Sequence, residues 1–218
     1  MALRNHLALF DFDNTLSICD SFLPFVLYIS GPVKFFSGIL NLARRRLSGP
    51  VGRREAKQIL AQATLKGLSI ESVQAAGKEF ADFFLPLAMN QLQLNRFKQH
   101  QAAGERVVIV SASPRLYLEV IAKELQAEII ATELVEVKGV ISGEIFGENC
   151  RGPEKVRRIS GVLDLKDYET ISAYGDSDGD TEMLRIATNR IYRGGRSNLY
   201  PIRKIFCTLA LYFKCLLH

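Results

Sequence analysis

A run of apolar residues near the start of the chain leads directly into two acids. Residues 7–10 are all apolar, and Asp11 and Asp13 follow with one residue between them. A short, unbroken apolar run is typical of a strand buried on both faces, as in a parallel sheet. Ligands of open α/β sheets bind beyond the carboxyl ends of such strands. The two acids therefore stand where a functional site is expected.

Later apolar runs predict further strands of the same sheet. They lie at 106–111, 128–131, 170–174 and 189–192. The run after Arg106 is rich in β-branched residues, which favour strands, and residues 133–146 predict a β-hairpin. Helical patterns separate these runs. The alternation predicts an α/β fold with a doubly wound, Rossmann-like, mostly parallel sheet.

A long stretch of helical periodicity separates the first strand from the second. It is interrupted at Gly31-Pro32 and at Gly49-Pro50, two breaker pairs, and Ser69 is placed to cap a later helix. We expect a helical cap, residues 18–94, inserted into a catalytic core formed by residues 1–17 and 95–198. Residues 199–218 predict an apolar C-terminal helix.

The amino-acid composition is that of a globular protein and limits its expected location and partners. Hydrophobic residues make up 48% and charged residues 23%, which is ordinary for a globular chain. The four cysteines show no metal-type spacing, so we expect reduced thiols and a cytoplasmic location. No secretory signal and no uninterrupted apolar run of about 18 residues is present, so no spanning helix is predicted. The net charge of +5 comes with no nucleic-acid recognition motif, so no nucleic-acid partner is expected.

Polar residues at four places fit the hydrolysis of a phosphate ester. They are Asp11 with Asp13, Ser111, Lys155, and Asp176 with Asp180. A carboxylate cannot attack an anionic ester unless a cation intervenes, and carboxylate oxygens suit Mg²⁺. We expect the four acids to form the magnesium site. Lys155, Ser111 and the backbone of Ala112 are expected to hold the phosphoryl oxygens.

The two acids after the first strand are given different roles. Asp11 is expected to attack phosphorus in line and form an aspartyl-phosphate. Asp13 is expected to protonate the leaving oxygen and then to activate water. Asp178, between two of the predicted ligands, is expected to cap a helix, and a lone Ser111 would more often be a cap than a ligand.

Together these motifs resemble those of the haloacid dehalogenase (HAD) superfamily. The resemblance covers residues 5–195 and includes an insert similar to the cap of the phosphoserine-phosphatase-like branch, subfamily IB. It implies a doubly wound core, Mg²⁺ and an aspartyl-phosphate intermediate. An acid at position 13 favours a phosphatase, since the dehalogenases lack it and the ion pumps carry threonine there.

Two assignments stay open. Arg151 aligns with the lysine motif almost as well as Lys155, which we prefer because Ile159 and Val162 follow at the spacing of buried helical residues. Asp20 occupies the position where phosphoserine phosphatases carry a glutamate that meets the substrate amine. It is one methylene shorter, so it either contacts the substrate or caps the following helix.

The insert bears on the substrate. Residues 21–47 are apolar and end in Arg44-Arg45-Arg46, a composition found in interfacial helices. The motifs around Lys155 and Asp176 also resemble those of phosphatidylglycerophosphatase C. The substrate is therefore expected to be a small metabolite phosphate or a lipid phosphate such as phosphatidylglycerophosphate, with peripheral membrane contact through 21–47 or 199–218. The alternatives are that the phenylalanines form the cap's own core, and that the chain is a catalytically silent phosphate-binding or membrane-surface module.

Overall fold

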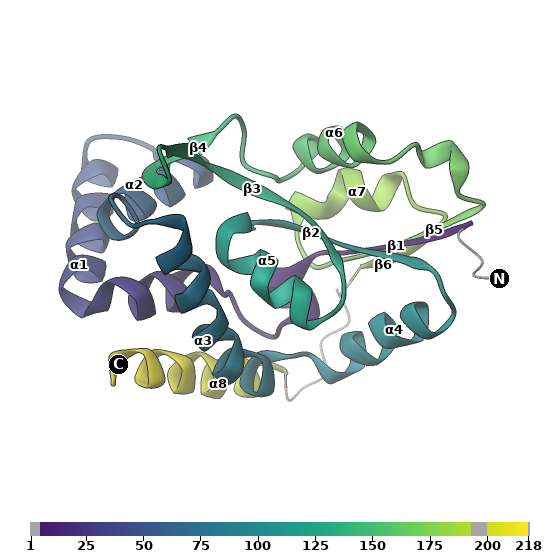
Figure 1. Cartoon of the computed structure of the whole chain (residues 1–218), viewed down its shortest axis with the longest axis horizontal. Helices are drawn as coiled ribbons and strands as arrows, with labels where there is room; N and C mark the ends of the chain where they lie inside the picture. Colours follow the sequence, from purple (N-terminus) through teal and green to yellow (C-terminus); the bar gives the residue numbers. More distant parts are fainter. Residues whose placement is uncertain (1–4, 193–199, 218) are drawn as a thin grey trace.

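A six-stranded sheet runs through the molecule (Figure 1). The computed structural model describes residues 5–192 and 200–217 of the chain. The strands are β1 (His6–Phe10), β2 (Arg106–Pro114), β3 (Glu128–Val137), β4 (Val140–Phe146), β5 (Thr170–Gly175) and β6 (Asn189–Tyr192). Their order is β4-β3-β2-β1-β5-β6, and all neighbours are parallel except β3 and β4. The predicted α/β fold with a mostly parallel sheet is confirmed.

The helices lie on both sides of this sheet and beyond one end of it (Figure 1). They are α1 (Phe22–Leu47), α2 (Arg53–Thr64), α3 (Ile70–Ala88), α4 (Gln91–Ala102), α5 (Arg115–Glu124), α6 (Pro153–Val162), α7 (Thr181–Arg185) and α8 (Tyr200–Leu216). Ser69 caps α3 as predicted, because its side chain accepts a hydrogen bond from the backbone N–H of Ser72.

The alternating side chains of β1 explain why its sequence is apolar throughout. Leu7 and Leu9 belong to a core shared with α6 and α7, whereas Ala8 and Phe10 belong to a core shared with α4, α5 and the helices of the insert. Both faces of the strand are therefore covered, as in other parallel sheets with helices on each side. This burial fixes the strand and hence the position of Asp11 at its carboxyl end.

Helix α1 is bent where the sequence predicted a break. Gly31 adopts a left-handed conformation, with φ of 71°, and Pro32 follows it. By length and composition α1 is also the one described helix that is long and apolar enough to cross a membrane. The sequence analysis predicted none because it asked for an uninterrupted apolar run, whereas α1 qualifies on mean hydropathy. The helix packs against α2, α3 and α8.

The β3–β4 hairpin reaches over the helical insert. Arg54 of α2 donates hydrogen bonds to the carbonyl oxygens of Ile145 and Gly147, at 3.4 and 2.9 Å. The division into core and cap stays a prediction, and its boundary at residue 198 falls in 193–199, outside the described residues. The last described segment, α8, packs against α1 and α3, and the Cys207 thiol lies 3.2 Å from that of Cys19.

Candidate active site

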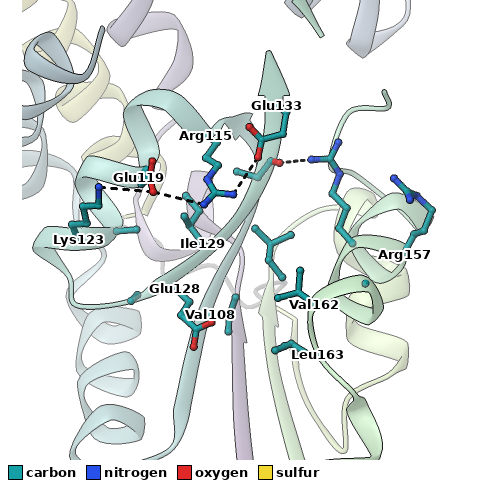
Figure 2. A pocket seen from close by; sticks show the side chains of 16 residues that line it. Val108, Arg115, Glu119, Lys123, Glu128, Ile129, Glu133, Arg157, Val162 and Leu163 are labelled. Carbon is teal, nitrogen blue, oxygen red and sulfur yellow. Dashed lines mark hydrogen bonds and ion pairs between the residues drawn. The ribbon is translucent and has the colours of Figure 1, made fainter. Parts of the chain in front are cut away.

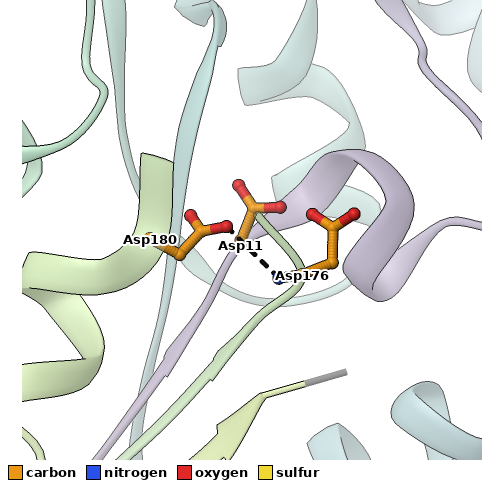
Figure 3. A group of neighbouring side chains, drawn as sticks. All are labelled: Asp11, Asp176 and Asp180. Atoms are coloured by element: carbon orange, nitrogen blue, oxygen red, sulfur yellow. Dashed lines mark hydrogen bonds between the residues drawn. The ribbon is translucent and has the colours of Figure 1, made fainter. Parts of the chain in front are cut away.

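Three carboxylates meet at the carboxyl ends of β1 and β5. The backbone N–H of Asp11 donates to the Tyr174 carbonyl across the two strands, at 2.9 Å. Asp176 and Asp180 follow β5, and each of the three acids places a carboxylate oxygen within 4.8 Å of the others (Figure 3). The turn that carries Asp180 needs a glycine, because a Cβ on Gly175 would lie 2.5 Å from the Cβ of Asp180.

Lys155 joins this group from α6. Its side chain is 1% exposed, and its ammonium donates to Asp11 Oδ1 at 2.7 Å, to Asp180 Oδ1 at 2.6 Å and to the Val110 carbonyl at 2.7 Å. The helix is positioned by Ile159, which is fully buried. Val162, the other residue used to prefer Lys155 over Arg151, is 62% exposed. That part of the sequence argument was wrong, because α6 ends at Val162 and turns it to the surface.

The charges of this group are unbalanced. Burial raises the pKa of Asp11 to about 8, with the Lys155 ammonium opposing this shift and the charge of Asp180 adding to it. Burial would also raise the pKa of Asp180, but the charge and hydrogen bond of Lys155 and the N–H groups of the turn lower it. The group thus contains three carboxylates and one ammonium, which pairs with two of them, Asp11 and Asp180, and all three carboxylates offer hard oxygen donors. This donor set fits Mg²⁺, whose charge would favour the ionised form of Asp11.

Asp180 is fixed in place by the turn before α7. Its Oδ2 accepts hydrogen bonds from the backbone N–H groups of Asp176 and Ser177 and from the Ser177 hydroxyl. Ser177, whose hydroxyl also accepts from the Gly179 N–H, is the cap of this turn. Asp178 was expected to be the cap, and this was wrong. Its exposed carboxylate instead pairs with Arg151.

Asp13 lies outside the cluster of three acids and has its own set of donors. Its Oδ1 accepts from the Ser21 backbone at 2.7 Å and from the Ser21 hydroxyl at 2.6 Å, and its Oδ2 accepts from the Ser113 hydroxyl at 2.6 Å. Ser21 is also 2.7 Å from the Tyr117 hydroxyl. Burial and the charge of Asp20 raise the pKa of Asp13 to about 6, although the hydroxyl donors act to lower it. A carboxyl with this pKa can exchange a proton near neutral pH.

Of the residues at the end of β2, some are buried in the protein core and others line the active-site cavity. Ser111 is fully buried, and its hydroxyl accepts from the backbone N–H of Ser113. Ala112 and Ser113, by contrast, line the cavity above the acids. Ser113 was not singled out from the sequence, where a second serine two residues after Ser111 gave no separate signal.

Lys57 of α2 also reaches the site and was missed by the sequence analysis. Its ammonium contacts the Ala112 carbonyl, lies 3.3 Å from Asn149 Oδ1 and sits 5.6 Å from the centre of the Phe22 ring. Burial lowers its pKa, with the charges of Asp20 and Asp13 opposing the shift. Asp20 accepts a hydrogen bond from the Leu23 N–H, at 3.0 Å, so the capping interpretation of Asp20 has a direct contact. Asp20 lines the cavity as well, and a role in specificity stays a prediction.

The cavity has a volume of about 900 Å³ and two chemically different walls. Its floor carries the acids and Lys155. The opposite wall comes from α1 and α2 and is apolar, with Phe22, Leu23, Ile39, Leu42 and Leu60. Arg46, Arg53 and Arg151 are further cationic residues of the lining. Such a space can receive an anionic group at the floor and an apolar group beside the helices.

A second hollow, of about 520 Å³, lies between α5, β3 and α6 (Figure 2). Its charged residues pair with one another, as Arg115 does with Glu133 and Glu119, and Lys123 with Glu119. Arg158 donates to Glu154 and to backbone carbonyl oxygens. Among the described residues, the second hollow therefore has no group of carboxylates like that formed by Asp11, Asp176 and Asp180 in the first cavity.

Comparison with known proteins agrees with this geometry. The family model for haloacid dehalogenase-like hydrolases matches residues 8–185, a span that contains all the acids described above. The chain is a haloacid dehalogenase-like hydrolase. This hydrolase is 36% identical over 191 residues to the protein CicA of Caulobacter vibrioides, covering 86% of this chain and 85% of CicA. The predicted superfamily and the prediction of an enzyme are confirmed.

Solved structures show the same fold. A protein of unknown function from Bordetella pertussis Tohama I has a TM-score of 0.76 and 24% identity, with 93% of this chain and 96% of that chain covered. A phosphoserine phosphatase bearing a phospho-aspartyl intermediate analogue has a TM-score of 0.56 and 24% identity, over 91% and 89%. The HAD hydrolase therefore has the fold of the predicted phosphoserine-phosphatase-like branch. The resemblance to phosphatidylglycerophosphatase C stays a prediction.

Proposed function

We propose that this HAD hydrolase is a magnesium-dependent phosphomonoesterase that works through an aspartyl-phosphate on Asp11. The observation that carries the proposal is the different setting of two acids one residue apart. Asp11 lies in the three-carboxylate cluster and contacts Lys155. Asp13 is held away from the cluster by hydroxyl donors. A nucleophile and a general acid–base are thus separated at one end of the sheet.

The metal is assigned to Asp11, Asp176 and Asp180, whose oxygens are close enough to share one cation. A bound Mg²⁺ supplies positive charge that offsets the repulsion between Asp11 and an anionic phosphoryl group. The sequence also predicted Asp13 as a metal ligand. Its two carboxylate oxygens already accept three hydrogen bonds, which favours the proton-transfer role for this side chain.

The reaction follows from the two acids. An ionised oxygen of Asp11 bonds to phosphorus while the ester P–O bond breaks, and Asp13 gives its proton to the departing oxygen. Asp13, now ionised, takes a proton from water, whose oxygen bonds to phosphorus and releases Asp11 and inorganic phosphate. Lys155 and the backbone beside Ser111 and Ala112 are assigned to the phosphoryl oxygens, where they would stabilise the charge that develops there.

The test is phosphate release from amino-acid, sugar, nucleotide and lipid phosphates in the presence of Mg²⁺. We expect Asp11→Asn to abolish turnover, because an amide oxygen is a far weaker nucleophile than a carboxylate. Asp82→Asn is the matched control, since Asp82 is an exposed acid of α3 away from the cavity. Wild-type rates in Asp11→Asn would remove the nucleophile from the proposal. EDTA is expected to silence the enzyme, and added Mg²⁺ to restore it.

The same panel decides between two substrate classes. A lipid phosphate is favoured by the apolar wall that α1 and α2 give the cavity, whereas a small metabolite phosphate needs only the floor. Phosphatidylglycerophosphate belongs to the first class. Failure to release phosphate from any member, with phosphate binding retained, would favour the silent phosphate-binding module.

A further inference from the structure

Helices α1 and α8 share a composition that, among the described helices, only the shorter α4 also has. Neither the segment Phe22–Leu47 nor the segment Tyr200–Leu216 contains an aspartate or glutamate, although the whole chain has 23 of them. Lysines and arginines are present in both. The two helices pack against each other, and α8 runs beside the first half of α1 (Figure 1). The two helices therefore contribute basic side chains and no acidic ones, and an acid that contacts α1, Glu79, comes from the neighbouring α3.

Helix α8 has one buried and one exposed apolar side. Cys207, Leu211 and Cys215 recur every four residues and are buried against α1 and α3. The outward residues Ile205, Phe206, Leu209 and Phe213 are 58–68% exposed. The outer side of a helix on a protein surface is normally polar. In α8 both sides are apolar. Packing against α1 and α3 explains the apolar residues of the buried side, but it does not explain those of the exposed side.

Helix α1 continues this surface beyond its bend. Val33 and Phe36 are 83% and 58% exposed, and the neighbouring Phe35 contacts Tyr212 of α8 with ring centres 6.4 Å apart. We call the set of Ile205, Phe206, Leu209, Phe213, Val33 and Phe36 the docking face. Lys34 and Lys214 are exposed beside it. An exposed group of large apolar residues of this kind marks an interaction site.

We propose that the docking face binds the surface of a bilayer that contains anionic lipid. Aromatic and aliphatic side chains with adjacent lysines, on helices without acids, have the chemistry of interfacial helices. Anionic headgroups attract such lysines. A second copy of the chain is a poorer match, because a symmetric contact would set the same basic surface against itself.

The docking face is connected to the active site. Lys204 of α8 donates to Asn14 Oδ1 at 2.5 Å, in the turn between Asp13 and α1. The other side of α1 lines the cavity with Leu23, Ile39 and Leu42. Binding through α1 and α8 would therefore hold the cavity near the lipid surface. The proposal itself stands on the surface chemistry and does not depend on hydrolysis.

The test is co-sedimentation of the full chain with vesicles of phosphatidylcholine alone or mixed with phosphatidylglycerol. The measurement is made at about 0.05 and about 0.5 M NaCl, since salt screens the attraction to headgroups. We expect binding to the mixed vesicles, weaker at high salt. The variant Phe206→Glu/Phe213→Glu should bind at least about tenfold less, because charged residues oppose insertion among the lipids. Leu92→Glu/Val162→Glu, with residues 60% and 62% exposed on α4 and α6, should bind like the wild type.

Three results would overturn the proposal. They are wild-type protein that stays in the supernatant with mixed vesicles, equal binding to vesicles of phosphatidylcholine alone, and a dimer in sedimentation velocity that the Phe206→Glu/Phe213→Glu variant loses. A milder pair, Phe206→Ser/Phe213→Ser, repeats the test if the glutamate variant unfolds. Hydrolysis of p-nitrophenyl phosphate is assayed in parallel. If the wild type does not hydrolyse this compound, the proposed phosphatase function is contradicted, but the vesicle experiment still tests membrane binding independently.

Discussion

Replacing Lys155 by methionine tests whether the buried charges form one unit. The change keeps most of the side-chain volume and removes three hydrogen bonds of 2.6–2.7 Å. Asp180, whose pKa is lowered and which is 1% exposed, would then carry a buried charge without its cation. Breaking a buried pair in this way costs about 3–5 kcal/mol. For a chain of this size the melting temperature should fall by about 6–20 °C.

The assay is urea and thermal unfolding in EDTA, where no metal can replace the ammonium. Lys78→Met, an exposed lysine of α3, is the matched control and should change stability by less than about 0.5 kcal/mol. Adding Asp180→Asn to Lys155→Met should recover part of the loss, since the unpaired charge is then removed, with a coupling of about 0.5–3 kcal/mol. If Lys155→Met and Lys78→Met lose the same stability, the reasoning about the buried pair is refuted.

Three further changes probe other parts of the structure. Gly143→Ala should lower the free energy of unfolding in urea by about 1–3 kcal/mol more than Gly139→Ala does. Both glycines have a positive φ, but only a Cβ on Gly143 would meet the α2 backbone, at 2.6 Å. Equal losses of stability in the two variants would contradict this contact. Ser21→Ala removes a hydrogen-bond donor to Asp13 and should therefore raise the pKa of Asp13. Because Asp13 must be protonated to act as the general acid, the basic limb of the kcat/KM–pH profile should move upward, and kcat should fall about tenfold. An unchanged profile would argue against a role of Ser21 in positioning Asp13, and Ser21→Thr should restore the wild-type profile. Hydrogen bonds from Arg157 and Arg158, one turn further along α6, lower the pKa of Glu154 to about 2. The contribution of ionised Glu154 to the stability of the fold is therefore present above about pH 4.5 and disappears as the pH falls toward 2. Glu154→Gln should remove about 1 kcal/mol of that acid-induced loss, measured by urea unfolding at the two ends of this range, and an unaltered loss would show that Glu154 is not its source.

The sequence predicted the sheet and the position of its acids because both follow from local pattern. An apolar run such as residues 7–10 has to be buried, and in a parallel sheet the residues after such runs meet at one edge. That logic brings Asp11, Asp176 and Asp180 together without knowledge of the fold's details. It also brings Lys155 to them, since α6 starts at the same edge.

Contacts between distant elements could not be predicted in this way. Lys57 is one of several polar residues on an amphipathic helix, and only the placement of α2 over the cavity gives it Asn149 and Phe22 as neighbours. The same holds for Ser113, which reaches Asp13 because β2 extends three residues further than the apolar run indicated. The capping role expected of Asp178 fell to Ser177 because a short extra turn precedes α7.

The bend at Gly31 changes what the apolar character of α1 means. A straight α-helix of 26 residues would measure about 39 Å, enough to traverse a bilayer from one headgroup layer to the other. The left-handed residue instead divides it into two arms that point in different directions (Figure 1). Two such arms cannot both follow the bilayer normal. A hydropathy plot of this chain would therefore indicate a membrane-spanning helix at α1, although α1 is bent in its middle.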